Sequence, residues 1–237
     1  FMLLKNTGSR KNYFGFLWHA VFLSITLTFT DVNSVMPAMI LRIGGKELHI
    51  GIVSAIMIGI PLIAKLFFTG FLQGKRRKKP YLLTGIYLRV VSLGLIALTL
   101  VNLSQLNSRL LMALIYFELL MFTVSGAFAG ISYIDLIGKS FNQALRKQFF
   151  GRKQIISSAG ILISAVSARQ LLRIVSFPYN YMVLFAAASA ILLIASAGFW
   201  LIREEPAPDS QKEGYLQTLG KIPSVLRNDP TLRKYLW

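Results

Sequence analysis

Six long apolar stretches, separated by short charged or turn-forming segments, follow one another along the chain. Each stretch reaches the roughly 20 mainly apolar residues that a helix needs to cross a hydrocarbon core of ~30 Å. The pattern therefore predicts membrane-spanning helices over residues 14–41, 49–72, 81–101, 110–137, 154–174 and 181–202. We expect residues 14–202 to form one all-α transmembrane domain, between a short N-terminal segment, 1–13, and a polar linker, 203–237.

The composition supports a membrane protein and excludes an ordinary soluble domain, because 54% of the residues are apolar and only 15% are charged. The net charge of +17 would indicate nucleic-acid binding in a soluble chain. Here the cations lie between apolar stretches. We therefore expect the lipid bilayer as a partner and no nucleic acid.

The residue types of the chain do not favour a metal site or a bound cofactor. It has no Cys, and its two histidines, His19 and His49, lie near opposite ends of different predicted helices. No cluster of carboxylates accompanies either histidine, so we expect both to be interfacial residues and predict no metal site. Since no His, Cys or carboxylate pair has catalytic spacing, the sequence predicts no enzyme and no cofactor.

Lys and Arg gather in alternate connections between the predicted helices. They are frequent in the segments 5–11, 75–79, 139–153 and 203–234, whereas the connections on the other side hold few of them. Cytoplasmic loops retain such cations and translocated loops have few. We therefore expect an integral protein of the plasma or inner membrane, with both termini in the cytoplasm.

Four charged residues lie inside the predicted spans: Asp31, Lys65, Arg89 and Glu118. A charge at this depth costs several kcal/mol unless it is paired or faces water, and it therefore indicates a functional site by default. Three of the four lie near the predicted midplane, and Lys65 lies somewhat nearer the cytoplasm.

Polar residues extend two of these charges into stripes along their helices. Ser24 and Thr28 precede Asp31 at helical spacing, and Ser125 follows Glu118 on the fourth predicted helix. A polar stripe within an apolar span faces an aqueous cavity or a protein partner. We expect these five residues to bind substrate or to couple its transport, with Asp31 changing its protonation state during the cycle.

Structural pairing is the alternative role for an intramembrane charge, because a cation and a carboxylate that meet in the membrane stabilise the bundle. We expect this role for Lys65 and Arg89. A pair between Arg89 and Glu118, across the hairpin of the third and fourth predicted helices, is one example.

The chain resembles the amino-terminal half of a major facilitator superfamily transporter over nearly its whole length. Residues 31–38 are similar to the family's first-helix signature, in which an acidic residue precedes a proline. Residues 146–152 are similar to the R-x-x-x-x-G segment before the fifth helix, and the start of the linker resembles the family's central loop.

The loop 70–79 resembles the family's G-x-L-x-D-R-x-G-R-K loop. Gly70, Leu72 and Lys79 match, and Lys75 and Lys78 replace arginines. Two positions depart from the pattern, because Gly74 stands where the family has aspartate and Arg77 where it has glycine.

The resemblance implies that this loop contributes to a cytoplasmic gate, to which we also assign Asp135 and Arg146. Asp135 lies at the cytoplasmic end of the fourth predicted helix, where the helix dipole disfavours a carboxylate. We therefore expect Asp135 to bridge the two basic loops through the cations of residues 75–79, Arg146 and Arg152, and to hold the half in one conformation.

The resemblance also implies two inverted three-helix repeats, with a small-molecule substrate bound near the midplane between two six-helix halves. Helices 1, 2, 4 and 5 would line the pathway, with helices 3 and 6 behind them. Because the chain starts at Phe1 and ends at Trp237, just where a new apolar stretch begins, we expect a fragment that lacks the C-terminal six-helix half. A natural C-terminus at Trp237 is the alternative.

A secondary active transporter of a small solute is the function that the sequence favours, with H+ as one candidate coupling ion. A six-span structural or assembly subunit without transport is the alternative. The substrate itself is not specified by the sequence, since one fold hosts many substrates.

Overall fold

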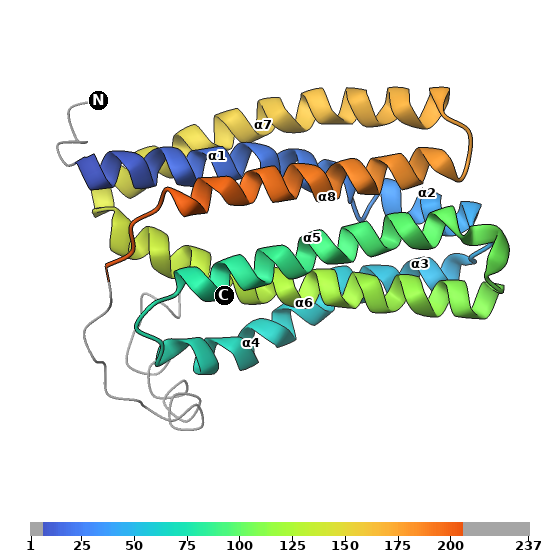
Figure 1. The fold of residues 1–237 in the computed structure, drawn as a ribbon, viewed down its shortest axis with the longest axis horizontal. Coiled ribbons are helices and arrows are strands. Elements are labelled where there is room, and N and C mark those ends of the chain that lie inside the picture. Colours follow the sequence, from blue (N-terminus) through green and yellow to red (C-terminus); the bar gives the residue numbers. More distant parts are fainter. Residues whose placement is uncertain (1–6, 206–237) are drawn as a thin grey trace, which may run out of the picture.

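The structure, a computed structural model, describes residues 7–205, and this part of the chain is helical without strands (Figure 1). Its helices are α1 (Thr7–Phe29), α2 (Val35–Arg42), α3 (Glu47–Ser54), α4 (Ile60–Gln73), α5 (Lys79–Val101), α6 (Ser108–Ser140), α7 (Gln143–Ile174) and α8 (Tyr179–Trp200). A π-helical turn, η1 (Ala55–Gly59), and a 3-10 turn, η2 (Leu103–Gln105), complete them. Residues 1–6 of the predicted N-terminal segment and residues 206–237 of the predicted linker lie outside the described residues.

Six of the described segments are long and apolar enough to cross a membrane, as the sequence predicts. They run antiparallel, so the start of α1 and the end of α8 lie at the same end of the bundle (Figure 1). Asn12 joins these two segments, since its Nδ2 donates to Arg203 O at 3.0 Å and its Oδ1 accepts from Arg203 N at 2.9 Å.

The first span is not the continuous helix expected over 14–41, because it breaks between α1 and α2 at residues 30–34. In the break, Asp31 Oδ1 accepts hydrogen bonds from Asn33 N at 3.1 Å and from Ser34 Oγ at 2.6 Å. Such local bonds compete with the helix. Pro37 adds to the effect, since a continuous helix would set its ring against the carbonyl group of Asn33.

The second span is also composite, because η1 lies between α3 and α4. Pro61 is in the first turn of α4, where its missing N–H group breaks the ladder of helical hydrogen bonds. A local change of helical pitch is a common response to such a gap. In Figure 1, α4 accordingly runs at an angle to α3.

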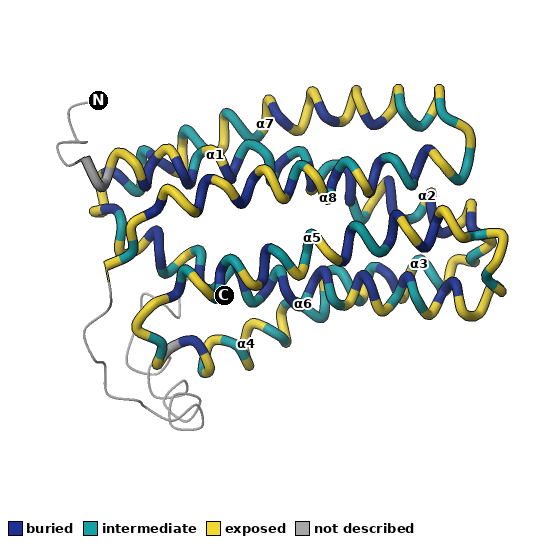
Figure 2. Tube along the Cα trace, viewed as in Figure 1, coloured by how far each residue is buried: buried dark blue, intermediate teal, exposed yellow. Residues whose placement is uncertain are grey.

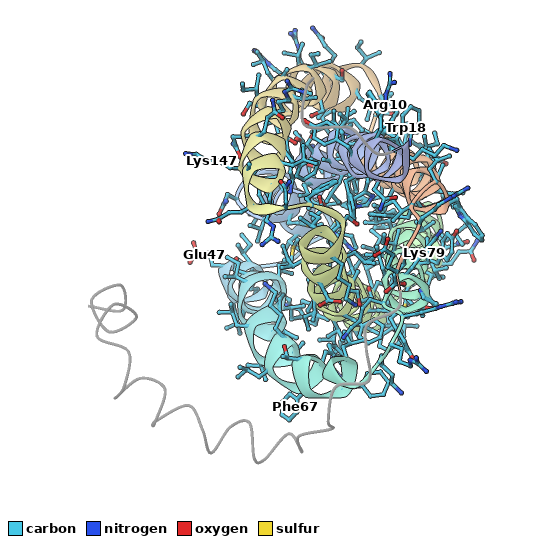
Figure 3. All side chains as sticks on the ribbon, turned by 90° about the vertical axis from the view of Figure 1, so that its left-hand side faces the viewer. Arg10, Trp18, Glu47, Phe67, Lys79 and Lys147 are labelled. Carbon is cyan, nitrogen blue, oxygen red and sulfur yellow. The ribbon has the colours of Figure 1, made fainter. Side chains whose placement is uncertain are left out.

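The most extensive helix contacts have the symmetry of two inverted three-helix repeats. α5 packs against α6 and α8, α1 packs against α7 and α8, and α4 packs against α6. Exchanging α1 with α6, α3–α4 with α7, and α5 with α8 reproduces this set of contacts. Figure 3 shows the resulting bundle from the end that carries Arg10, Lys79 and Lys147.

Burial divides the helices into a covered and an uncovered group (Figure 2). α5 and α8 are nearly half buried within the bundle, whereas the second span and α7 are mostly exposed. The exposed side chains are large and apolar, including Leu62 and Phe67 on α4 and Leu162 and Ile163 on α7. These faces are suited to contact lipid or another apolar protein surface.

Candidate functional site

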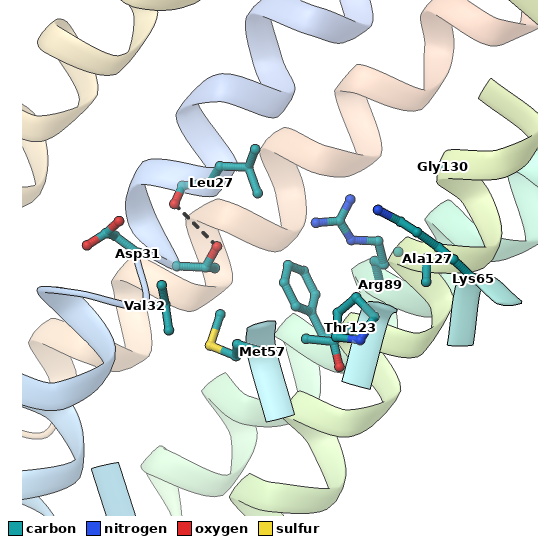
Figure 4. A pocket seen from close by; sticks show the side chains of 13 residues that line it. Leu27, Asp31, Val32, Met57, Lys65, Arg89, Thr123, Ala127 and Gly130 are labelled. Atoms are coloured by element: carbon teal, nitrogen blue, oxygen red, sulfur yellow. Dashed lines mark hydrogen bonds between the residues drawn. The ribbon is translucent and has the colours of Figure 1, made fainter. Parts of the chain in front are cut away.

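A cavity of about 410 Å³ lies between α1, the second span, α5 and α6. Its wall includes three of the four intramembrane charges, Asp31, Lys65 and Arg89 (Figure 4). Phe122 and Thr123 of α6 also line it. The structure thus brings together charges that come from three different spans.

Arg89 lies in the middle of α5, about 15 Å from its first residue and about 18 Å from its last at the helical rise. Its guanidinium carbon is 4.3 Å from the centroid of the Phe122 ring, a cation–π contact. A Cβ atom added to Gly126 would lie 3.3 Å from Arg89 Nε, so the glycine leaves room for the guanidinium. Arg89 Nε is enclosed and has no hydrogen-bond acceptor within residues 7–205.

Lys65 reaches the same cavity from α4. In Figure 4, the nitrogen-bearing ends of Lys65 and Arg89 are turned to the same part of the cavity. Neither cation forms an ion pair within the described part of the chain, which differs from the structural pairing that we expected for them. Their charges are therefore not neutralised by direct contact with a described carboxylate.

Asp31 lies where α1 and α2 are interrupted, and its carboxylate is bound to its own turn by Asn33 and Ser34. Figure 4 shows the carboxylate directed away from Arg89 and Lys65. Asp31 also lines a second groove, of about 640 Å³, between the first span and α7. It therefore lies in the wall that the two spaces share.

Glu118 is placed away from the cavity, although it lies at a depth similar to that of Arg89. Its side chain is buried between α5 and α6, and its Oε1 accepts a hydrogen bond from Thr99 Oγ1 at 2.7 Å. The suggested Arg89–Glu118 ion pair is thus not formed in the described structure. Ser125 is buried on the same helix and donates to Met121 O at 2.6 Å.

Ser24 and Thr28 occupy positions outside the 410 Å³ cavity. Ser24 donates to Val21 O at 2.7 Å and faces α7, since a Cβ atom added to Gly160 would lie 2.6 Å from its Oγ. Thr28 donates to Ser24 O at 3.0 Å and lines the second groove. The polar stripe therefore follows the contact between α1 and α7, and Thr28 shares the second groove with Asp31.

One of the two histidines, His19, does not have the interfacial position that we expected. His19 is buried between α1 and α8, with its Nδ1 3.3 Å from Ala195 O. His49 lies at the start of α3, where its Nδ1 accepts from Lys46 N at 3.1 Å. Both rings thus have local hydrogen-bond partners.

A second group of charges joins the basic ends of several helices. Glu204 accepts from Lys78 N at 2.5 Å and from Lys79 N at 2.8 Å, so its carboxylate caps the start of α5. Lys79 Nζ donates back to Ile202 O at 2.8 Å, and Lys78 Nζ donates to Leu72 O at the end of α4. Glu204 thus binds two of the expected gate residues, and Lys78 connects it to a third, Leu72.

Sequence reasoning did not single out Glu204, which it treated as the start of the linker. Free N–H groups at the start of a helix attract a carboxylate, so the start of α5 could have been predicted to bind one. The sequence does not indicate which carboxylate responds, because 126 positions separate Lys78 from Glu204.

Asp135 forms its ion pair with Lys139, at 2.7 Å, one turn along its own helix. Lys139 Nζ also lies 4.0 Å from Glu204 Oε1. Lys139 is thus in direct contact with Asp135, and the charge of Asp135 also acts on Lys78, one of the loop cations that we expected it to bridge. Burial lowers the pKa of Lys78 below its ordinary value, and the nearby charges of Asp135 and Glu204 oppose this shift.

The remaining gate residues have separate local roles. Lys75 Nζ lies 4.7 Å from the centroid of the Phe71 ring. Arg146 donates from Nη2 to Gly138 O at 3.1 Å and to Phe141 O at 3.2 Å, which caps the end of α6. Gly70 lies in the last turns of α4. These three residues do not contribute to the contacts around Glu204 that are described above.

Comparison with known proteins gives one match. The family model of the Major Facilitator Superfamily matches residues 21–237, which is most of the chain. No curated protein and no solved structure shows a significant match.

Proposed function

Because the chain belongs to the Major Facilitator Superfamily, a superfamily of membrane transporters, we propose that it forms the amino-terminal six-helix half of a secondary transporter that moves a small solute by alternating access. The observation that carries this proposal is the cavity lined by Asp31, Lys65 and Arg89. Charges in the membrane interior are costly in free energy. A structural subunit that does not transport a solute would have no need for three of them around a cavity.

The uncovered helices support the presence of a second half. The apolar faces of α4 and α7 are exposed, and related transporters bind substrate between two halves of this kind. We assign the end with the Glu204 contacts to the cytoplasm, because the basic loops are there. We also assign the protein to the plasma or inner membrane.

Asp31 is the residue to which we assign coupling within this proposal. It lies in the wall between two spaces and at a break between two helices, where a change of its charge can alter the local hydrogen bonds to Asn33 and Ser34.

Accessibility of the cavity from both sides of the membrane tests the proposal. This chain has no Cys, so Thr123→Cys in the complete protein places one thiol of the described half in the cavity wall. We expect a membrane-impermeant thiol reagent to reach it from the outside and, in inverted vesicles, from the inside.

Two exposed positions provide the controls for this experiment. Lys46→Cys should react from the outside and Arg77→Cys from the cytoplasm, because they lie in connections at opposite ends of the bundle. Reaction of Thr123→Cys from one side alone, or from neither, would refute alternating access through this cavity. Reaction of Arg77→Cys from the outside would refute the orientation.

A further inference from the structure

The cavity contains more cationic than anionic groups that are free to meet a ligand. Arg89 and Lys65 turn their nitrogen-bearing ends into one part of it (Figure 4). Among the described residues that line it, the one carboxylate is that of Asp31, which points away and already accepts two hydrogen bonds. The space between the two cations therefore attracts negative charge.

The surroundings of Arg89 fix a guanidinium in place without neutralising it. The Phe122 ring holds one face of the group, and Gly126 leaves the space beside it open. Arg89 Nε has no acceptor among the described residues, although a buried donor without an acceptor is costly. A ligand with oxygen atoms would supply the hydrogen-bond acceptor that Arg89 Nε lacks among the described residues.

We propose that the cavity binds a small anionic solute, whose carboxylate or phosphate group is held by Arg89 and Lys65. This inference rests on the proposed function and names the class of substrate. A guanidinium forms paired hydrogen bonds with two oxygens of one such group, and an ammonium adds a point charge beside it. The volume of about 410 Å³ lies within the range for sites of small metabolites.

Ligand-induced stabilisation of the complete protein, purified in detergent, tests this inference. The anionic probes are succinate, inorganic phosphate and glycerol 3-phosphate, at constant ionic strength. Succinamide and 1,4-diaminobutane are the neutral and cationic counterparts of succinate. We expect at least one anion to raise the unfolding temperature in a saturable way, and neither counterpart to do so, since a ligand that binds the folded state stabilises it.

Variants locate the effect in the cavity. Arg89→Gln and Lys65→Gln should weaken the anion's apparent affinity at least tenfold, whereas Arg89→Lys should retain part of it. Lys147→Gln, at an exposed position of α7, removes one positive charge from the surface and should bind as the original protein does. If Arg89→Gln does not fold, Arg89→Lys and Lys65→Gln decide the question.

Three outcomes would overturn the inference: no anion stabilises the protein beyond its counterparts, the cation stabilises it equally, or the anion binds Arg89→Gln as well as the original. The labelling of Thr123→Cys from both sides is measured separately. If it succeeds while no anion binds, the protein is a transporter without an anion site; if it fails, the proposed function itself is wrong.

Discussion

Replacing Arg89 with methionine should make the ligand-free protein more stable. The substitution keeps an unbranched apolar stem against Phe122 and removes the charge and its donors. The reason is that Arg89 has no anionic partner in the described structure and lies in the middle of a span.

The size of the effect follows from two opposing contributions. A buried donor of a charged group that has no acceptor, as Arg89 Nε has none among the described residues, costs about 3 kcal/mol. Loss of the contact with the Phe122 ring removes about 1 kcal/mol of stabilisation. The net gain is about 2 kcal/mol, which corresponds to a rise of about 4–8 °C in unfolding temperature for a unit of this size.

Thermal unfolding in detergent, followed by tryptophan fluorescence, measures this change. Lys147→Met is the matched control, since it removes a cation from an exposed position and should change stability by no more than about 0.5 kcal/mol. A fall in the unfolding temperature of Arg89→Met, with Lys147→Met unchanged, would refute the reasoning, because it would mean that Arg89 has a stabilising partner.

Three other substitutions test separate parts of the structure. Glu204→Gln weakens the cap of α5 and should cost about 1 kcal/mol in thermal unfolding, whereas Glu205→Gln, at an exposed position, should not. Thr99→Val removes the donor to buried Glu118 and should cost about 1–3 kcal/mol in the same assay; unchanged stability would exclude that role. Asp31→Asn should leave insertion intact and abolish concentrative uptake in the complete protein, so normal uptake would contradict coupling at this position.

The sequence predicts the spans and the depth of each intramembrane charge, because hydropathy and the helical rise determine both. It does not predict which way a helix is rotated. Arg89 and Glu118 lie at similar depths, yet Arg89 faces the cavity and Glu118 faces Thr99. That difference depends on how α5 packs against α6, to which the apolar stretches give no direct clue.

The break in the first span could have been anticipated from local residues. Asp31, Asn33 and Ser34 all form hydrogen bonds that compete with a helix, and Pro37 follows within one turn. Hydropathy is insensitive to such a break, since the stretch remains apolar on average. The role of Glu204 depends instead on a contact between distant segments, which a single sequence does not reveal.

Uptake into liposomes tests the central claim most directly, namely that the cavity around Arg89 carries a small anion across the membrane. The complete protein is reconstituted, and the entry of radiolabelled succinate, phosphate and glycerol 3-phosphate is followed with and without a pH gradient. We predict saturable uptake of at least one anion, its loss in Arg89→Gln and its retention in Lys147→Gln. No uptake above that of protein-free liposomes, or equal uptake by folded Arg89→Gln, would contradict the account.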